Sequence, residues 1–97
     1  MFRIEFTSDA FSDLEALRKY DQQRVMRELE EQMMHEPALE TRRRKRLRPN
    51  RLAEWELRAG DFRVFYDVES EAGLVRVVAI AVKRGSRLFV HGEEFDL

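Results

Sequence analysis

The sequence predicts an α+β fold made of an N-terminal strand, an antiparallel two-helix hairpin and then an antiparallel sheet of three to four strands. Two changes in hydrophobic periodicity support this prediction. Apolar residues alternate at the N-terminus, recur at helical spacing as far as residue 33, and alternate again from residue 54. The chain has 97 residues, of which 43% are hydrophobic, so we expect a single domain over residues 1–97 with one core.

The first element is predicted to be a half-buried strand. The segment FRIEF, residues 2–6, alternates apolar and charged side chains, which is the period of a strand with one buried face. Thr7 and Ser8 follow, and either hydroxyl can accept a hydrogen bond from a free backbone N–H group at the start of a helix. A helix is therefore expected directly after the strand.

The first helix is predicted from the spacing of its apolar residues. Phe11, Leu14 and Leu17 recur at intervals of three, with acidic residues early in the segment. Arg18 and Lys19 are expected to lie in its last turn, because cations there interact favourably with the helix dipole.

A second helix is expected to begin at Asp21, whose carboxylate can cap it, and to stop before Pro37. Its apolar stripe consists of Val25, Met26, Leu29 and Met33. Because so few residues separate the two helices, we expect them to form an antiparallel hairpin that covers one face of the sheet.

The second half of the chain is predicted to be a strand meander. EWELR (54–58) and FRVFYDV (62–68) alternate apolar and polar residues on either side of a turn at Gly60. LVRVVAIAV (74–82) is almost entirely apolar, as expected of a central strand covered on both faces. RLFVH (87–91) is expected to add a short edge strand.

Alternation also predicts which strand residues face the helices. We expect Trp55, Leu57 and Tyr66 to join the core beneath the helical hairpin. Arg63 then points to the opposite, open face of the sheet.

The charges of this chain are unevenly distributed. Its net charge is only -1, but RRRKRLRPNR, residues 42–51, holds seven of the 18 basic residues and no acidic one. The remaining 11 basic residues stand against 19 acidic residues, a net charge of -8 for the rest of the chain. Such a run favours binding to phosphate backbones or to an acidic partner. The alternative is a solvated loop that the chain's own carboxylates neutralise.

Several other classes of site are not indicated. The chain has no cysteine, and His35 and His91 do not have metal-ligand spacing, so neither a metal nor another cofactor is expected. No apolar run is long enough for a signal peptide or a membrane span. We therefore expect a cytoplasmic protein with no membrane partner.

The strand ends supply further candidate functional cations. Lys83 and Arg84 end the central strand, and Arg87 follows two residues later. Together with Arg63 and the run at 42–51, they are expected to line one concave cationic surface on the open face. Isolated solvated cations are the alternative, since Lys and Arg are mostly exposed in any protein.

Two segments resemble the RelE/ParE superfamily of toxins from bacterial type II toxin-antitoxin modules. They are KRLRPNRLAEWELRAGDFRVFYDV and VRVVAIAVKRGSRLFV, within residues 45–90. The family shows a basic segment, an aromatic-x-[LI]-R strand, a [YF]-R-[VL]-x-Y strand and a hydrophobic strand that ends in two cations. The resemblance implies the RelE/ParE-like fold over nearly the whole chain.

The resemblance also implies a function. RelE-type members cleave messenger RNA, usually in the ribosomal A site, whereas ParE-type members share the fold and poison DNA gyrase. We expect a metal-independent, ribosome-dependent endoribonuclease (an mRNA interferase) that inhibits translation, with a cognate antitoxin, the ribosome and mRNA as partners. The alternatives are a gyrase poison and a non-catalytic member that binds an antitoxin.

By this resemblance, the catalytic residues are Arg63, Arg84, Lys83, Lys45 and His91. The tyrosine often found near the family's C-terminus is missing here. The residues expected to bind nucleic acid are Arg42, Arg43, Arg44, Lys45, Arg46, Arg48, Arg51 and Arg87.

A cationic set suits RNA cleavage without a metal. The 2′-OH attacks the adjacent phosphate and charge grows on its oxygens, so prepositioned guanidinium groups stabilise the transition state. Arg63 and Arg84 are the expected stabilisers. Arginine is a poor general base because its pKa lies above about 12, which leaves proton transfer to Lys83, Lys45, His91 or groups of the ribosomal RNA.

Overall fold

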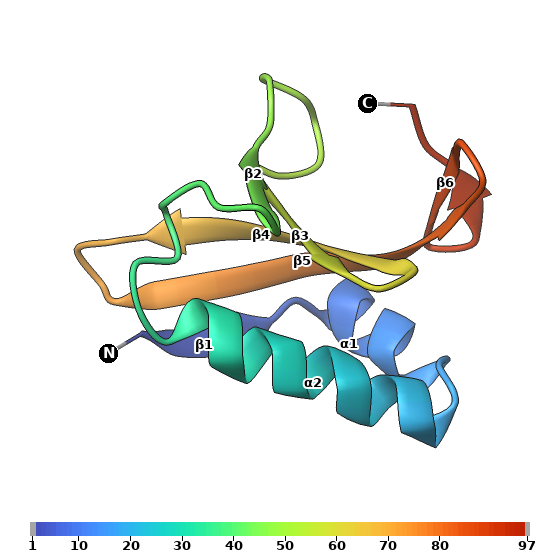
Figure 1. Ribbon diagram of the computed structural model, residues 1–97, viewed down its shortest axis with the longest axis horizontal. Coiled ribbons are helices and arrows are strands. Elements are labelled where there is room, and N and C mark those ends of the chain that lie inside the picture. Colours follow the sequence, from blue (N-terminus) through green and yellow to red (C-terminus); the bar gives the residue numbers. More distant parts are fainter. Residues whose placement is uncertain (1, 97) are drawn as a thin grey trace.

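The computed structural model describes residues 2–96, and it confirms the predicted α+β fold. The two helices lie on one side of a curved sheet, and the C-terminal hairpin rises from the other side (Figure 1). The elements are β1 (Arg3–Phe6), α1 (Ser8–Glu15), α2 (Lys19–Met33), β2 (Arg44–Arg46), β3 (Trp55–Ala59), β4 (Phe62–Glu69), β5 (Leu74–Arg84), β6 (Arg87–Val90) and β7 (Glu93–Glu94). Neither helix is long and apolar enough to cross a membrane.

The sheet is built around β5, which confirms the predicted central strand. The strand order is β2-β3-β4-β5-β6-β7, and all of these neighbours are antiparallel. The other edge of β5 is shared, because β1 pairs with its first half in parallel, from Leu74 to Val77, and β6 pairs with its end, from Val82 to Arg84. The parallel pairing of β1 is a feature that periodicity did not predict.

A side chain of α1 fills the gap that β1 and β6 leave along this edge. The backbone N–H of Ile80 donates a hydrogen bond to Asp13 Oδ2 at 3.0 Å. The other carboxylate oxygen of Asp13 lies 2.8 Å from Nδ1 of His91, just after β6. Asp13 therefore takes the place of a strand carbonyl and also connects α1 to the C-terminal hairpin.

The helix boundaries differ from the prediction at the turn between the two helices, where both the end of α1 and the start of α2 are affected. Thr7 caps α1 as expected, accepting a hydrogen bond from the N–H of Ala10 at 3.1 Å. However, α1 ends at Glu15, so Arg18 and Lys19 do not lie in its last turn.

Arg18 and Lys19 instead open α2, where Arg18 is an N-cap without a side-chain cap hydrogen bond. The prediction that Asp21 caps α2 is wrong, because Asp21 lies inside the first turn. The turn between the helices is held by the Gln22 side chain, whose amide donates to the Leu17 carbonyl at 2.9 Å.

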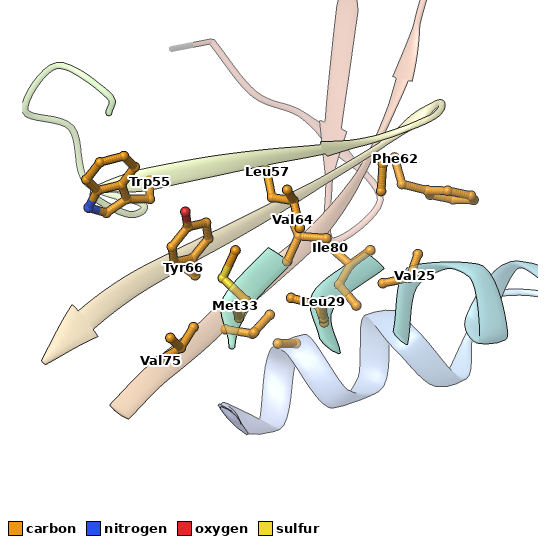
Figure 2. Close-up of a cluster of buried hydrophobic side chains, with 13 residues drawn as sticks. Val25, Leu29, Met33, Trp55, Leu57, Phe62, Val64, Tyr66, Val75 and Ile80 are labelled. Carbon is orange, nitrogen blue, oxygen red and sulfur yellow. The ribbon is translucent and has the colours of Figure 1, made fainter. Parts of the chain in front are cut away.

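The main core lies between the helices and the sheet. Figure 2 shows α2 directing Val25, Leu29 and Met33 toward side chains of β3, β4 and β5. Trp55 and Tyr66 stack there, with ring centroids 6.1 Å apart and an interplanar angle of 18°. Trp55, Leu57 and Tyr66 are all buried, which confirms the predicted assignment of the strand faces.

The face of the sheet away from the helices is partly covered by other segments of the chain. Phe65, Ala79 and Ala81 form a second buried cluster there, packed against residues of the loop before β3 and of the C-terminal segment. In Figure 1 this loop and the C-terminal hairpin rise from that side of the sheet, and their residues line clefts there. Because these segments cover part of the face, the accessible part consists of clefts between them.

The end of α2 is tied to the sheet by Arg44. Its Nη1 donates hydrogen bonds to the carbonyls of Gln32 at 2.9 Å, His35 at 3.3 Å and Glu36 at 2.9 Å. These carbonyls lie at a helix C-terminus, where no further turn can satisfy them. Arg44 is only 7% exposed. It was expected to bind nucleic acid, but it is buried as the partner of this helix end.

Tyr66 lies beside Arg44, and its hydroxyl donates to the Pro37 carbonyl at 3.0 Å. Burial raises the pKa of Tyr66 above its usual value, although the nearby Arg44 charge opposes this shift. An unfolded tyrosine ionises near pH 10, whereas the folded one stays neutral at that pH. Its contribution to stability is thus fully present below about pH 10 and is lost as the pH rises further.

Tyr66→Phe should therefore reduce the alkaline sensitivity of the fold. We expect the variant to lose about 1 kcal/mol at neutral pH, for the missing hydrogen bond to the Pro37 carbonyl. Between about pH 9 and 11 its free energy of unfolding should fall less steeply than that of the wild type. Urea melts across this range test the prediction, with the exposed Tyr20→Phe as control. Equal pH slopes for the two variants would contradict it.

Candidate active site

The predicted catalytic residues divide between the two faces of the sheet. Lys83 and Arg84 are consecutive on β5, so their side chains point to opposite faces. Lys83 lies on the open face with Lys45 and Arg63, whereas Arg84 lies on the helix side with His91. The prediction that Arg84 lines one cationic surface with Arg63 and Lys83 is therefore wrong.

The open-face cleft is defined by Lys45, Glu56, Arg63 and Lys83. It measures about 800 Å³ and is bordered on its far side by residues of β6 and the C-terminal segment. Lys45 on β2 pairs directly with Glu56 on β3, and Arg63 on β4 pairs with Ala81, two residues before Lys83 on β5. Four neighbouring strands thus each contribute one side chain.

Arg63 is held in place by the turn that precedes it. Its Nη1 donates to the Gly60 carbonyl at 2.7 Å and to the Phe62 carbonyl at 2.9 Å. A guanidinium group has five N–H donors, so donors remain for a ligand while these bonds restrict its movement. Such a fixed cation can stabilise charge with little reorganisation.

Glu56 is a candidate that the sequence reasoning missed. It is half-buried, and it forms no ion pair within residues 2–96 although cations surround it in the cleft. A signal was present, because Glu56 lies between Trp55 and Leu57, which face the helices. Alternation therefore places its carboxylate on the same face as Arg63.

The helix-side cleft holds the other two predicted catalytic residues. It measures about 440 Å³ and is lined by Arg84 and His91 together with Asp13, Val82 and Phe89, among other residues. The Asp13–His91 contact fixes one ring nitrogen of the histidine. The sheet itself separates this group from Arg63.

A third cleft lies between α2 and the edge of the sheet. This arginine cleft measures about 600 Å³, and its lining consists of Arg24, Arg27, Glu28, Arg42, Arg43, Arg58 and Gly60. Arg42 and Arg43 belong to the predicted run, but Arg24, Arg27 and Arg58 were not singled out. A smaller cleft of about 180 Å³ is lined by Arg42, Arg43 and Arg58 and also by Lys45, Glu56, Arg63 and Lys83, so it connects the arginine cleft to the open-face cleft.

Part of the predicted nucleic-acid surface is neutralised by the protein itself. Arg43 donates to both oxygens of Glu28, at 2.8 and 3.0 Å, and Arg87 contacts Glu94 at 2.7 Å. Arg46 lies 3.9 Å from a carboxylate oxygen of Glu54 and also lies over the Trp55 ring.

Other cations of the predicted surface remain available. Within residues 2–96, Arg42, Lys45 and Arg48 form no ion pair, and Arg51 lies over the Phe95 ring. The alternative interpretation, in which the chain's own carboxylates neutralise the basic run, therefore holds for Arg43 and Arg46 but not for Arg42, Lys45 and Arg48. In the same part of the chain, no group of three or more His, Asp or Glu side chains could hold a metal ion.

Comparisons with known proteins agree with this architecture. A family model described as the ParE toxin of type II toxin-antitoxin systems, parDE, matches residues 4–88. A chain in the crystal structure of the toxin-antitoxin complex RelBE2 from Mycobacterium tuberculosis is similar, with a TM-score of 0.73 and 23% sequence identity. The match covers 84% of this chain and 91% of that chain, and at this identity it supports the fold alone. No curated protein matches significantly.

Proposed function

The chain belongs to the ParE toxin family of type II toxin-antitoxin systems, and on that premise we propose that it is a metal-independent endoribonuclease that cleaves mRNA on the ribosome. The observation that carries the proposal is the position of one carboxylate, Glu56, among Lys45, Arg63 and Lys83 in the open-face cleft. RNA cleavage without a metal requires a proton acceptor, a proton donor and fixed positive charge around one phosphate. This cleft contains all three kinds of group.

The proposed reaction is an internal transesterification. The Glu56 carboxylate takes the proton of the 2′-OH, and the 2′-oxygen then forms a bond to the adjacent phosphorus. Arg63 stabilises the charge that develops on the non-bridging oxygens. The bond from phosphorus to the 5′-oxygen breaks, and the ammonium group of Lys45 or Lys83 donates a proton to that oxygen. The products are a 2′,3′-cyclic phosphate and a 5′-hydroxyl.

The surrounding cations would bind the RNA backbone. Arg42, Lys45 and Arg48, which form no ion pair within residues 2–96, can contact phosphates, which gives salt-dependent binding without reading the base sequence. Ribosome and mRNA as partners, and a cytoplasmic location, follow from this proposal. The cognate antitoxin that a type II toxin requires is expected to present acidic residues to the same surface.

A gyrase poison is the second candidate, and two observations favour it. One is that the family model matching residues 4–88 describes the ParE toxin. The other is that Arg84 and His91, which the family resemblance assigned to catalysis, lie on the other side of the sheet from Arg63. A poison of gyrase needs a binding surface for another protein and no RNA chemistry, so it would not need these residues to meet.

The two candidates can be separated in one pair of reactions. The purified protein is added to ribosomes stalled on a defined mRNA and, separately, to gyrase with relaxed plasmid. We expect cut mRNA with 5′-hydroxyl ends and intact plasmid. Linear plasmid with intact mRNA would instead support the gyrase poison. If neither substrate is cut, the chain is a non-catalytic member that binds an antitoxin.

A further inference from the structure

The arginine cleft brings together five guanidinium groups and a single carboxylate, Glu28. Glu28 is already paired with Arg43, to which it offers both oxygens. Within residues 2–96, Arg24, Arg27, Arg42 and Arg58 form no ion pair. Four positive charges in one cleft therefore lack a partner within the described chain, and an anionic ligand would supply one.

The fold brings these arginines together from three separate segments. Arg24 and Arg27 stand one helical turn apart on α2, which presents them on the same side of the helix. Arg42 and Arg43 precede β2, and Arg58 lies on β3, where its backbone N–H donates to the Arg43 carbonyl at 2.8 Å. The side chain of Arg58 also reaches the Arg42 carbonyl at 3.5 Å.

Gly60 in the β3–β4 turn leaves room for the Arg24 guanidinium, which lies against it. The φ of Gly60 is +64°, which favours glycine, and a Cβ atom there would meet the guanidinium of Arg24. The carbonyl of the same residue accepts the hydrogen bond from Arg63. One turn therefore positions a guanidinium of the arginine cleft on one side and the proposed catalytic arginine on the other.

We infer that the arginine cleft binds backbone phosphates of the same nucleic-acid strand that enters the open-face cleft. The smaller cleft lies between them and shares Arg42, Arg43 and Arg58 with the arginine cleft and Lys45, Glu56, Arg63 and Lys83 with the open-face cleft. A polymer with one charge on every unit can therefore follow all three. Arginine is suited to this role because its planar fork binds phosphate oxygens in pairs. The inference relies on the proposed function only in taking the strand to be RNA.

The lining argues against an acidic peptide as the occupant. Peptides that bind tightly bring apolar side chains into pockets, whereas this cleft is lined by arginines, one glutamate and one glycine, with no apolar side chain. A phosphate backbone needs no such pocket. Continuity with the open-face cleft likewise favours a long strand over a small phosphate compound.

The test measures binding of a fluorescent 2′-O-methyl RNA of about 20 nucleotides, which has no free 2′-OH to attack and so is not cleaved. We expect Arg24→Gln/Arg27→Gln to weaken binding roughly 10-fold at low salt. The slope of log K against log salt should fall by about 1.4, because each lost phosphate contact on a single strand contributes about 0.7. The control Lys19→Gln removes an exposed charge from the same helix, outside the cleft, and should change neither quantity.

Three results would overturn the inference. The double variant could match Lys19→Gln in RNA affinity and salt slope. It could lose affinity only for inorganic triphosphate, which would identify a small-anion site, or only for an acidic antitoxin peptide.

This test does not depend on nuclease activity, because the RNA used in it is not cleaved. If the protein cleaves mRNA but the substitutions at Arg24 and Arg27 leave its RNA affinity unchanged, the inference is refuted and the proposed function is not. Thermal melts check that each variant is folded.

Discussion

Glu56→Gln is expected to lower the single-turnover rate of mRNA cleavage on the ribosome by at least about 100-fold, because the amide cannot accept the proton of the 2′-OH. The substitution preserves the size of the side chain, so binding should change little. Arg63→Ala should lower the same rate by roughly 100-fold, since its main interaction is with the charge that develops in the transition state. Rates at saturating ribosome concentration are the measurement.

Arg84→Ala provides the control for both variants. It removes an arginine one residue from Lys83, but on the face of the sheet away from the open-face cleft. We expect its rate to stay within about threefold of the wild type, in the range of changes made away from reacting groups. If Arg84→Ala and His91→Ala abolish cleavage while Glu56→Gln does not, the helix-side cleft is the active site. If all of these changes act only on binding, none of the residues is catalytic.

Trp55→Ala is expected to destabilise the fold by about 3 to 5 kcal/mol, which is a large part of the stability of a small domain. Trp55 is only 3% exposed and stacks on Tyr66 in the helix-side core. The alanine would leave a cavity that the neighbouring helix and strands cannot close. Urea melts at neutral pH measure the change in the free energy of unfolding.

Tyr20→Ala is the matched control for that experiment. It also removes an aromatic ring, but Tyr20 is 73% exposed on the outer side of α2. Its effect should stay near 0.5 kcal/mol, as for other surface substitutions. A loss below about 1 kcal/mol for Trp55→Ala would mean that the tryptophan contributes far less than its burial implies.

The strand faces and the helix-forming stripes could be predicted because they depend on local periodicity. Trp55, Leu57 and Tyr66 alternate with polar residues, and the same rule would have placed Glu56 and Lys83 on one face and Arg84 on the other. The end of α1 could not be predicted, since no glycine or proline marks the chain after Glu15. That break depends on how α2 returns across the sheet.

The roles of individual arginines were less predictable than the run that contains them. Arg44 is indistinguishable in sequence from Arg42 and Arg43, and only the docking of the α2 C-terminus against β2 buries it. The arginine cleft likewise exists only because α2 packs near the β3–β4 turn. Its members Arg24 and Arg27 are far from Arg58 in sequence, and composition does not indicate that they meet.

The bond between Asp13 and the Ile80 amide has a consequence for how the domain fluctuates. β6 pairs with β5 through only three residue pairs, and the Asp13–His91 contact joins the hairpin to α1. Local opening of this hairpin breaks fewer contacts than global unfolding, so its amides should exchange with deuterium through sub-global events. The Ile80 amide is held by a side chain and not by a neighbouring strand. We expect it to exchange when Asp13 of α1 releases it, whereas opening of the hairpin alone breaks only the contact of Asp13 with His91. Exchange of the Ile80 amide should therefore report on the contact between α1 and β5, separately from opening of the hairpin.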